Sequence, residues 1–213
     1  MSSDYVRHST KLAMVLAAFA LVGTSLLALT FDATKDIIAA SEKKAKLALI
    51  AQILPPELYD NDIISDAVNL PPQPELGTAE ATVTYRALKD GKPSAVVLEA
   101  VAPDGYAGKI KLLIAIKADG VISGVRVVSH KETPGLGDYI EIAKSNWIKG
   151  FDGTSLEKYQ SKDWKVKKDG GQFDSVAGAT ITPRAVVKAV YKALGYFSAN
   201  REKIFTLPKE QAK

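Results

Sequence analysis

An uncharged apolar run over residues 12–31 constrains the fold of this 213-residue chain more than any other feature. About twenty residues of α-helix rise about 30 Å, which matches the hydrocarbon core of a bilayer. A cleaved signal peptide has a shorter apolar region followed by a small-residue cleavage site, and no such site is evident here. A buried helix of a water-soluble domain is the third alternative. We predict an uncleaved transmembrane helix.

Basic residues lie on both sides of this run, so their number does not decide which end of the helix is inside the cell. Long C-terminal domains cross a membrane largely regardless of their charge. We therefore expect the N-terminus inside the cell and the large domain outside. The basic residues considered are Arg7 and Lys11 before the run, and Lys35, Lys43, Lys44 and Lys46 after it.

The chain has no cysteine and two histidines, which removes several kinds of chemistry. Disulfides, thiolate-bound zinc, iron–sulfur clusters and thiol nucleophiles are excluded. His130 and Glu132 are two residues apart and could share a face, but without a second histidine nearby we expect no metal site. The net charge of +4 is too small to indicate nucleic-acid binding.

Composition along the chain suggests four segments. We predict a tail and transmembrane helix over 1–31, a helical stalk and proline-rich linker over 32–78, a folded domain over 79–200 and a C-terminal tail over 201–213. Pro55 and Pro56 are expected to end the stalk helix, because proline lacks the N–H that a helix interior requires.

Alternating apolar residues predict two strand pairs in the folded domain, with turns at Asp90-Gly91 and Asp119-Gly120. We also expect a helix over 139–148, a short strand pair within 158–168, and a last helix in which Thr182 is the cap and Pro183 the first residue. Strands without a βαβ rhythm indicate an α+β fold. The predicted architecture is an antiparallel sheet with packed helices behind one N-terminal transmembrane helix.

Two glycine-containing loops are the candidate functional segments. In the first, residues 131–138, Gly135 and Gly137 lack Cβ atoms, so a flat ligand could approach the backbone closely. In the second, residues 174–183, small residues precede a helix whose free N–H groups could bind an anion, with Arg184 one turn further on. An ordinary turn and an ordinary capped junction are the alternatives.

The second loop carries a recognisable motif. Its sequence from Asp174 to Thr180 resembles the Asp-x-x-(Ser/Thr)-Gly-Ala-Thr flavinylation motif of FMN-binding domains, with Ala177 where serine or threonine is usual. The resemblance implies an FMN joined by a phosphoester to Thr180. Thr182 is the competing acceptor.

Three further stretches extend the resemblance. Residues 54–62, 105–120 and 130–138 are similar to the G subunit of the Rnf/Rsx electron transport complex. This resemblance implies an electron-carrying subunit of an NADH- and ferredoxin-linked, ion-translocating oxidoreductase, with no complete active site of its own. It implies membrane and iron–sulfur subunits as partners and maturation by a flavin transferase that uses FAD. It also implies a single-pass protein of the bacterial inner membrane with a periplasmic FMN domain.

The resemblance further implies which residues contact the FMN. Leu136 is expected on the face of the ring, with Glu132 or Lys131 near its polar edge, while Trp147 is expected to anchor the core rather than stack on the flavin. The alternatives are the C-type FMN subunit of a sodium-pumping NADH:quinone reductase and a membrane-anchored flavin-binding module without redox turnover. The predicted cofactor residues are Thr180, Gly178, Ala179, Ser175, Thr182, Lys131, Glu132, Thr133, Gly135, Leu136 and Gly137, with Asp174 at the start of the motif.

Overall fold

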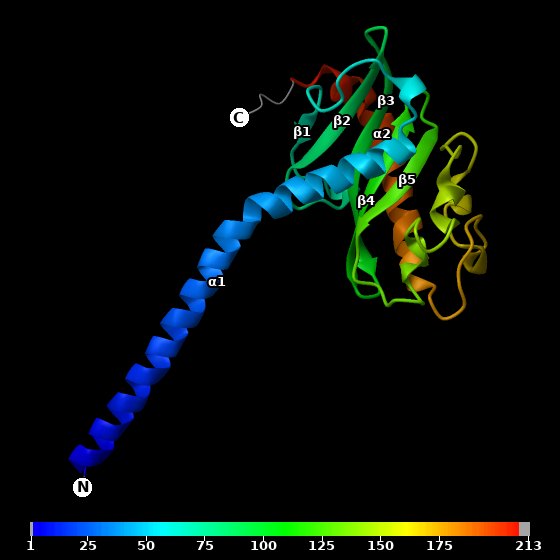
Figure 1. The fold of residues 1–213 in the computed structure, drawn as a ribbon. Helices are drawn as coiled ribbons and strands as arrows, with labels where there is room; N and C mark the ends of the chain where they lie inside the picture. Colours follow the sequence, from blue (N-terminus) through cyan, green and yellow to red (C-terminus); the bar gives the residue numbers. More distant parts are fainter. Residues whose placement is uncertain (1, 209–213) are drawn as a thin grey trace. The chain divides into compact units, whose positions relative to one another are not determined.

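A computed structural model describes residues 2–208 (Figure 1). Contacts between residues divide the chain into two compact units, Met1–Lys46 and Leu47–Lys213. The first helix, α1 (Ser2–Ile53), contributes to both units.

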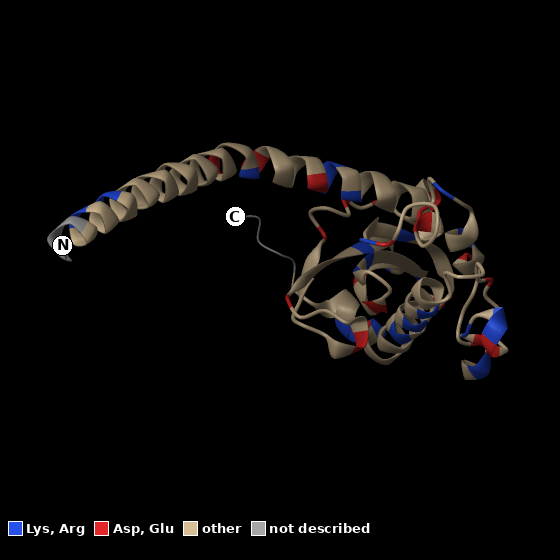
Figure 2. Cartoon of the chain, turned by 90° about the horizontal axis from the view of Figure 1, so that it is seen from below, with Lys and Arg blue, Asp and Glu red and all other residues tan. Residues whose placement is uncertain are grey.

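The first unit consists of α1 up to Lys46. Figure 2 shows a long stretch of this helix without charge, and the apolar side chains there are exposed. The hydroxyls of Thr24 and Thr30 donate to carbonyls four residues earlier, which satisfies them without water. Among residues 2–208, α1 is the one helix long and apolar enough to cross a membrane.

The second unit contains a five-stranded antiparallel sheet with strand order β1-β2-β3-β4-β5. Both predicted turns are present, and positive φ angles of 50° at Asp90 and 71° at Gly91 suit a tight hairpin. The predicted α+β class is confirmed. The strands are β1 (Val68–Leu70), β2 (Thr82–Lys89), β3 (Lys92–Gly105), β4 (Gly108–Lys117) and β5 (Ile122–Ser129).

Each face of this sheet is covered by a helix, because side chains alternate between the two faces. Helix α2 (Ile181–Thr206) packs on one face, where Leu98 and Ile114 lie in the larger core cluster with Phe197. On the other face, Ile50 and Ile53 at the end of α1 lie in a second cluster, together with residues of β2, β3 and β4 whose side chains point to that face. Burying one such side chain contributes about 1.5–3 kcal/mol. The second cluster includes Leu54, Tyr85, Ala87, Val97, Leu113 and Ala115.

Two buried arginines on the sheet bind the C-terminal ends of these helices. Arg126 on β5 donates to the Gln52 side chain at 3.0 Å and to its carbonyl at 3.5 Å. Arg86 on β2 donates to the carbonyls of Phe205 at 3.1 Å and Leu207 at 2.7 Å. Burial lowers the pKa of both guanidinium groups, and the carbonyls at the negative helix ends offset part of that desolvation.

The unit boundaries differ from the predicted segments. Pro55 follows the end of α1 as expected, but the folded unit begins at Leu47, and Leu76 in the expected linker is buried. Strand β1 also lies in that linker and pairs with β2. At the other end α2 continues to Thr206 with Ile204 buried, so the expected tail begins inside a helix. Residues 209–213 of that tail lie outside the described residues.

Between β5 and α2 the chain forms short 3-10 turns, so the predicted helix over 139–148 and the strand pair within 158–168 were wrong. Aromatic packing holds this segment: Trp147 contacts Phe151 edge-on at 5.5 Å, and Phe151 stacks on Phe173 at 4.6 Å. Val166 makes an isolated parallel bridge to Phe173. The turns of this segment are η3 (Asp138–Ile140), η4 (Trp147–Phe151), η5 (Ser161–Asp163) and η6 (Lys167–Asp169); two others, η1 (Pro56–Leu58) and η2 (Pro74–Leu76), lie before β2.

Candidate functional site

A cleft of about 110 Å³ lies at the edge of the sheet where β3 turns into β4, β5 ends and α2 begins. Figure 1 shows the orange start of α2 at this end of the sheet. The cleft therefore combines the two glycine-containing loops that the sequence singled out. Its lining residues are Tyr106, Glu132, Thr133, Leu136, Gly137, Gly178, Ala179, Ile181 and Thr182.

Glu132 connects the three walls of the cleft. Its side chain is 4% exposed. One carboxylate oxygen accepts a hydrogen bond from the backbone N–H of Ala107 at 2.9 Å, in the turn between β3 and β4. The other accepts the hydroxyl hydrogen of Thr182 in the first turn of α2. The loop after β5 is thus bound to both neighbouring segments by a single carboxylate.

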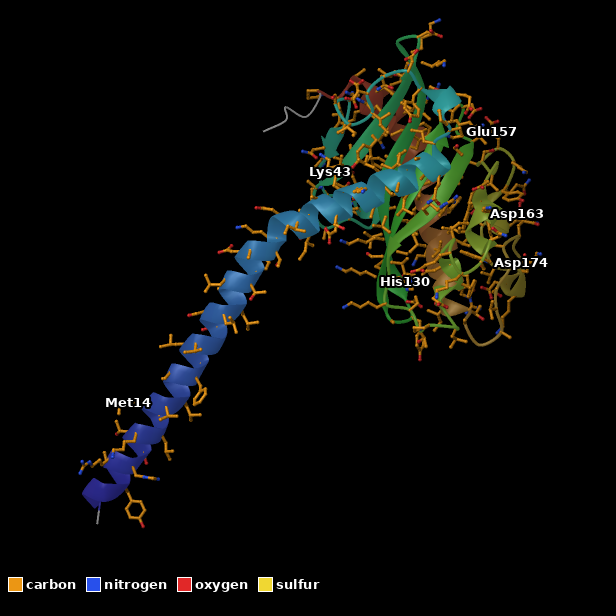
Figure 3. The ribbon with its side chains drawn as sticks, in the orientation of Figure 1. Met14, Lys43, His130, Glu157, Asp163 and Asp174 are labelled. Carbon is orange, nitrogen blue, oxygen red and sulfur yellow. The ribbon has the colours of Figure 1, made fainter. Side chains whose placement is uncertain are left out.

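His130 fixes the backbone of Glu132. Its Nδ1 accepts the Glu132 N–H at 2.9 Å, and its Nε2 lies 2.7 Å from a carboxylate oxygen of Glu141. Because Nδ1 accepts, the hydrogen-bond network assigns the proton to Nε2, which donates to Glu141. His130 and Asp174, both labelled in Figure 3, come from the two loops that meet at this end of the unit.

The two glycines of the first loop serve different needs. Gly135 has a φ of +74°, and its N–H donates to the carboxylate of Asp138 at 2.8 Å. Gly137 has an ordinary φ of −98°, but a Cβ atom there would lie 3.0 Å from the Glu132 carboxylate and 3.2 Å from the Thr182 hydroxyl. Gly135 provides the turn, and Gly137 leaves space for the Glu132–Thr182 contact.

Helix α2 begins two residues earlier than expected. Thr180 is the N-cap and Ile181 the first helical residue, so the prediction of Thr182 as the cap was wrong. The Thr182 hydroxyl donates to Glu132 instead. Thr180 makes no side-chain capping bond, and among residues 2–208 its hydroxyl has no hydrogen-bond partner. Its side chain is 9% exposed and is not among the groups that line the cleft.

The loop before α2 is anchored from the aromatic cluster. The indole N–H of Trp147 donates to the carbonyl of Asp174 at 2.8 Å, and the hydroxyl of Tyr139 donates to the carbonyl of Ala179 at 3.3 Å. Trp147 also packs edge-on against Tyr139 at 5.6 Å. It therefore packs against the core, as predicted, and holds the motif in place.

Several predicted residues lie away from the lining of the cleft. These are Lys131, Gly135, Asp174 and Ser175, as well as Thr180. Arg184 is occupied elsewhere, because its Nε and Nη2 each lie 2.6 Å from a carboxylate oxygen of Asp169.

Sequence reasoning missed two lining residues, Tyr106 and Ile181. Tyr106 is 67% exposed in the turn between Gly105 and Gly108. An aromatic residue between two glycines at a strand-pair turn was the available signal.

Comparisons with known families match two regions of the chain. Residues 105–195 match the FMN-binding domain, and residues 1–53 match the RnfG N-terminal region. The first match includes every residue that lines the cleft.

Curated relatives extend over nearly the whole chain. The G subunit of the ion-translocating oxidoreductase complex of Pseudomonas aeruginosa is 50% identical and covers 97% of this chain and 96% of its own. The G subunit of the same complex from Aliivibrio fischeri is 43% identical over 93% and 94%, and that from Shewanella oneidensis is 45% identical over 92% of each.

A solved structure shows a weaker likeness. The crystal structure of the C subunit of the Na(+)-translocating NADH-quinone reductase from Parabacteroides distasonis is 22% identical, covers 72% of this chain and 81% of its own, and gives a TM-score of 0.44.

Proposed function

Because this chain belongs to the family of G subunits of the ion-translocating oxidoreductase complex, we propose that it carries electrons in such a complex through an FMN esterified to Thr180. When bound, FMN supplies the capacity to accept and release electrons. The chain's own residues bind and orient that group.

The residues of the cleft fit a flat aromatic cofactor. Tyr106, Leu136 and Ile181 are exposed apolar side chains grouped in this lining, and a cleft lined mainly by apolar side chains is typical of a ligand site. Gly178 has a φ of +83° and leaves open space beside Leu136. A Cβ atom added at Gly178 would lie 4.0 Å from the Cδ1 atom of Leu136 and would meet no nearer atom. We propose that the ring of the FMN lies along the loop from Thr133 to Gly137.

Two observations support Thr180 over Thr182 as the attachment residue. The Thr182 hydroxyl is enclosed between the Glu132 carboxylate and Gly137, where even a Cβ atom would be crowded. A phosphodiester on Thr182 would also place a negative charge directly against that carboxylate. Thr180 makes no side-chain capping bond, so a phosphoester on its hydroxyl would break no such bond and would not lie against the Glu132–Thr182 contact.

The start of α2 provides a favourable setting for the remaining charge of a phosphodiester. The first-turn N–H groups of Ile181 and Thr182 lack intrahelical partners, and the positive end of the helix dipole lies there. Such a helix end contributes about 0.3–1 kcal/mol, which is too little to retain a cofactor alone. A covalent bond therefore matters for retention.

The same proposal includes a place and partners for the chain. We propose that α1 crosses the bacterial inner membrane once, with the N-terminus in the cytoplasm and the FMN domain in the periplasm. The remaining membrane and iron–sulfur subunits would exchange electrons with the flavin, and a transferase would attach it from FAD. A flavin-binding module without redox turnover is the second candidate, and it would hold the same FMN without passing electrons through a complex.

The test is to express the full chain with a flavin transferase and digest it with trypsin. The peptide of residues 169–184 contains Thr180 and Thr182, and we expect it to gain the mass of FMN minus water, with fragment ions that place the addition on Thr180. Thr180→Ala should abolish the addition, because the Thr182 hydroxyl is enclosed against Glu132 and cannot replace it.

Thr182→Ser is the matched control, because serine retains the hydroxyl that donates to Glu132. It should keep the modification. An unmodified wild-type peptide, or a modified Thr180→Ala peptide, would contradict the assignment.

A further inference from the structure

We propose that the buried carboxylate of Glu132 lowers the reduction potential of the flavin by keeping an unneutralised negative charge in the wall of the cleft. This inference rests on the proposed function, since it assumes that the FMN occupies the cleft lined by Glu132 and Leu136. It concerns a positioning residue that tunes the cofactor, which no motif in the sequence assigns.

Glu132 uses both oxygens of its side chain within the wall of the cleft. Both oxygens accept, one from the Ala107 N–H and one from the Thr182 hydroxyl.

The partners of Glu132 leave its charge in place. Both hydrogen-bond donors are neutral, and within residues 2–208 no lysine, arginine or histidine side chain forms an ion pair with Glu132. His130 contacts its backbone N–H, not its carboxylate. A full negative charge therefore remains in the wall of the cleft.

Glu132 is buried at 4% exposure, and its carboxylate lies where two glycines lack side chains. A Cβ atom at Gly105 would lie 2.9 Å from one carboxylate oxygen, and one at Gly137 would lie 3.0 Å from the other. Both glycines thus leave the room that the carboxylate occupies, and the His130 bond fixes the backbone behind it.

A buried charge acts strongly on a neighbouring group because water screens it poorly. Reduction adds negative charge to a flavin, so a fixed negative charge beside it opposes reduction. Net charge, hydrogen bonding and burial are the means by which a protein sets the potential of a bound cofactor. In this cleft the sign of the nearest buried charge predicts a shift toward lower potential.

The decisive variant is Glu132→Gln in the full chain, loaded with FMN and kept in detergent. Glutamine has nearly the same shape, and its hydrogen bonds can all be made: the amide oxygen accepts the Ala107 N–H, and the amide nitrogen donates to a Thr182 hydroxyl that has rotated. The variant removes the charge and keeps the contacts. Spectroelectrochemical titration should give a midpoint potential above that of the wild type.

Two controls separate charge from structure. Thr182→Val removes a hydrogen bond to Glu132 but keeps its charge, so the potential should stay the same or fall. Glu141→Gln removes a carboxylate that is bound to His130 rather than placed in the cleft, so the potential should change less than in Glu132→Gln.

A second variant keeps Glu132 and adds a positive charge beside it. It tests the effect of charge on the midpoint potential if Glu132→Gln does not bind FMN. Thr133 is an exposed lining residue, and Thr133→Lys places a positive charge near the carboxylate. It should raise the potential relative to Thr133→Gln, which adds length without charge.

The outcomes distinguish this inference from the proposed function. If the wild-type chain carries no FMN, the proposed function fails. If FMN is attached at Thr180, but neither Glu132→Gln nor Thr133→Lys raises the midpoint potential above its reference, the role of Glu132 is overturned and the covalent cofactor is unaffected.

Discussion

At the scale of single residues, the loop that carries Thr180 depends on a few hydrogen bonds from the aromatic cluster. The phenol of Tyr139 donates to the Ala179 carbonyl, one residue before Thr180. Burial raises the pKa of Tyr139, so its hydroxyl remains a neutral donor beyond the pH at which an exposed tyrosine ionises.

Tyr139→Phe should lower the free energy of unfolding of the full chain in detergent by about 0.5–1.5 kcal/mol, the usual net value of one hydrogen bond. Urea titration at neutral pH measures this loss. The difference from wild type should vanish as the pH rises through the raised pKa of Tyr139, because the ionised phenolate no longer donates. Tyr106→Phe is the control: Tyr106 is exposed, and its hydroxyl has no partner among the described residues, so its stability should be unchanged.

At the level of residues, the sequence pointed to residues that do line the cleft or shape its loop, but it did not reveal what each of them does there. Gly135 and Gly137 were both singled out for close approach of a ligand, yet one provides a positive φ and the other leaves space for Glu132. Glu132 was expected at a polar edge, but its bonds to Ala107 and Thr182 join residues 25 and 50 positions away. Local sequence patterns carry no information about such distant partners.

At the scale of elements, the end of α1 packs closely against β5 at one glycine. A Cβ atom at Gly124 on β5 would lie 2.7 Å from the side chain of Ile53. Strand β5 leads directly into His130 and the loop of the cleft.

Gly124→Ala should therefore destabilise the second unit by about 1–3 kcal/mol, the usual cost of overpacking a core. Thermal unfolding of the full chain in detergent, followed by circular dichroism, measures the effect. Gly195→Ala in α2 is the matched control: a Cβ there meets nothing within 4 Å, so alanine should stabilise the helix by up to about 1 kcal/mol. An unchanged melting temperature in Gly124→Ala would show that α1 can shift at no cost.

Elements with strong local signals were predictable, and those held by tertiary contacts were not. The turn dipeptides identified both strand pairs, and the apolar face of α2 identified that helix. The 3-10 turns of the Trp147 region follow from ring packing among residues distant in sequence, which overrides helical spacing. Strand β1 was missed because three residues directly before Pro71 and Pro72 carry too little alternation to detect.

At the scale of the whole molecule, the absence of cysteine makes topology directly testable. Single variants Tyr5→Cys and Lys149→Cys would each carry the only thiol, on either side of the apolar run. In intact spheroplasts a membrane-impermeant maleimide should label Lys149→Cys and label Tyr5→Cys only after lysis. The reverse pattern would place the folded unit in the cytoplasm.

Sequence reasoning identified the family and the membrane segment because both depend on short contiguous stretches. The division into units was harder to predict, since the last turn of α1 is continuous with the apolar helix but packs in the core of the second unit. Periodicity along one helix cannot distinguish residues that face lipid from residues that face a sheet.

The small volume of the cleft affects how readily a reduced FMN bound there would react with dioxygen. Pockets that enclose a ligand usually measure about 300–1,000 Å³, whereas this one measures about 110 Å³. Dioxygen would reach a reduced ring seated there as easily as a physiological acceptor would. A protein surface that covered Tyr106 and Ile181 would shield such a ring from autoxidation, so superoxide release by the FMN-loaded isolated chain should then exceed that of the assembled complex.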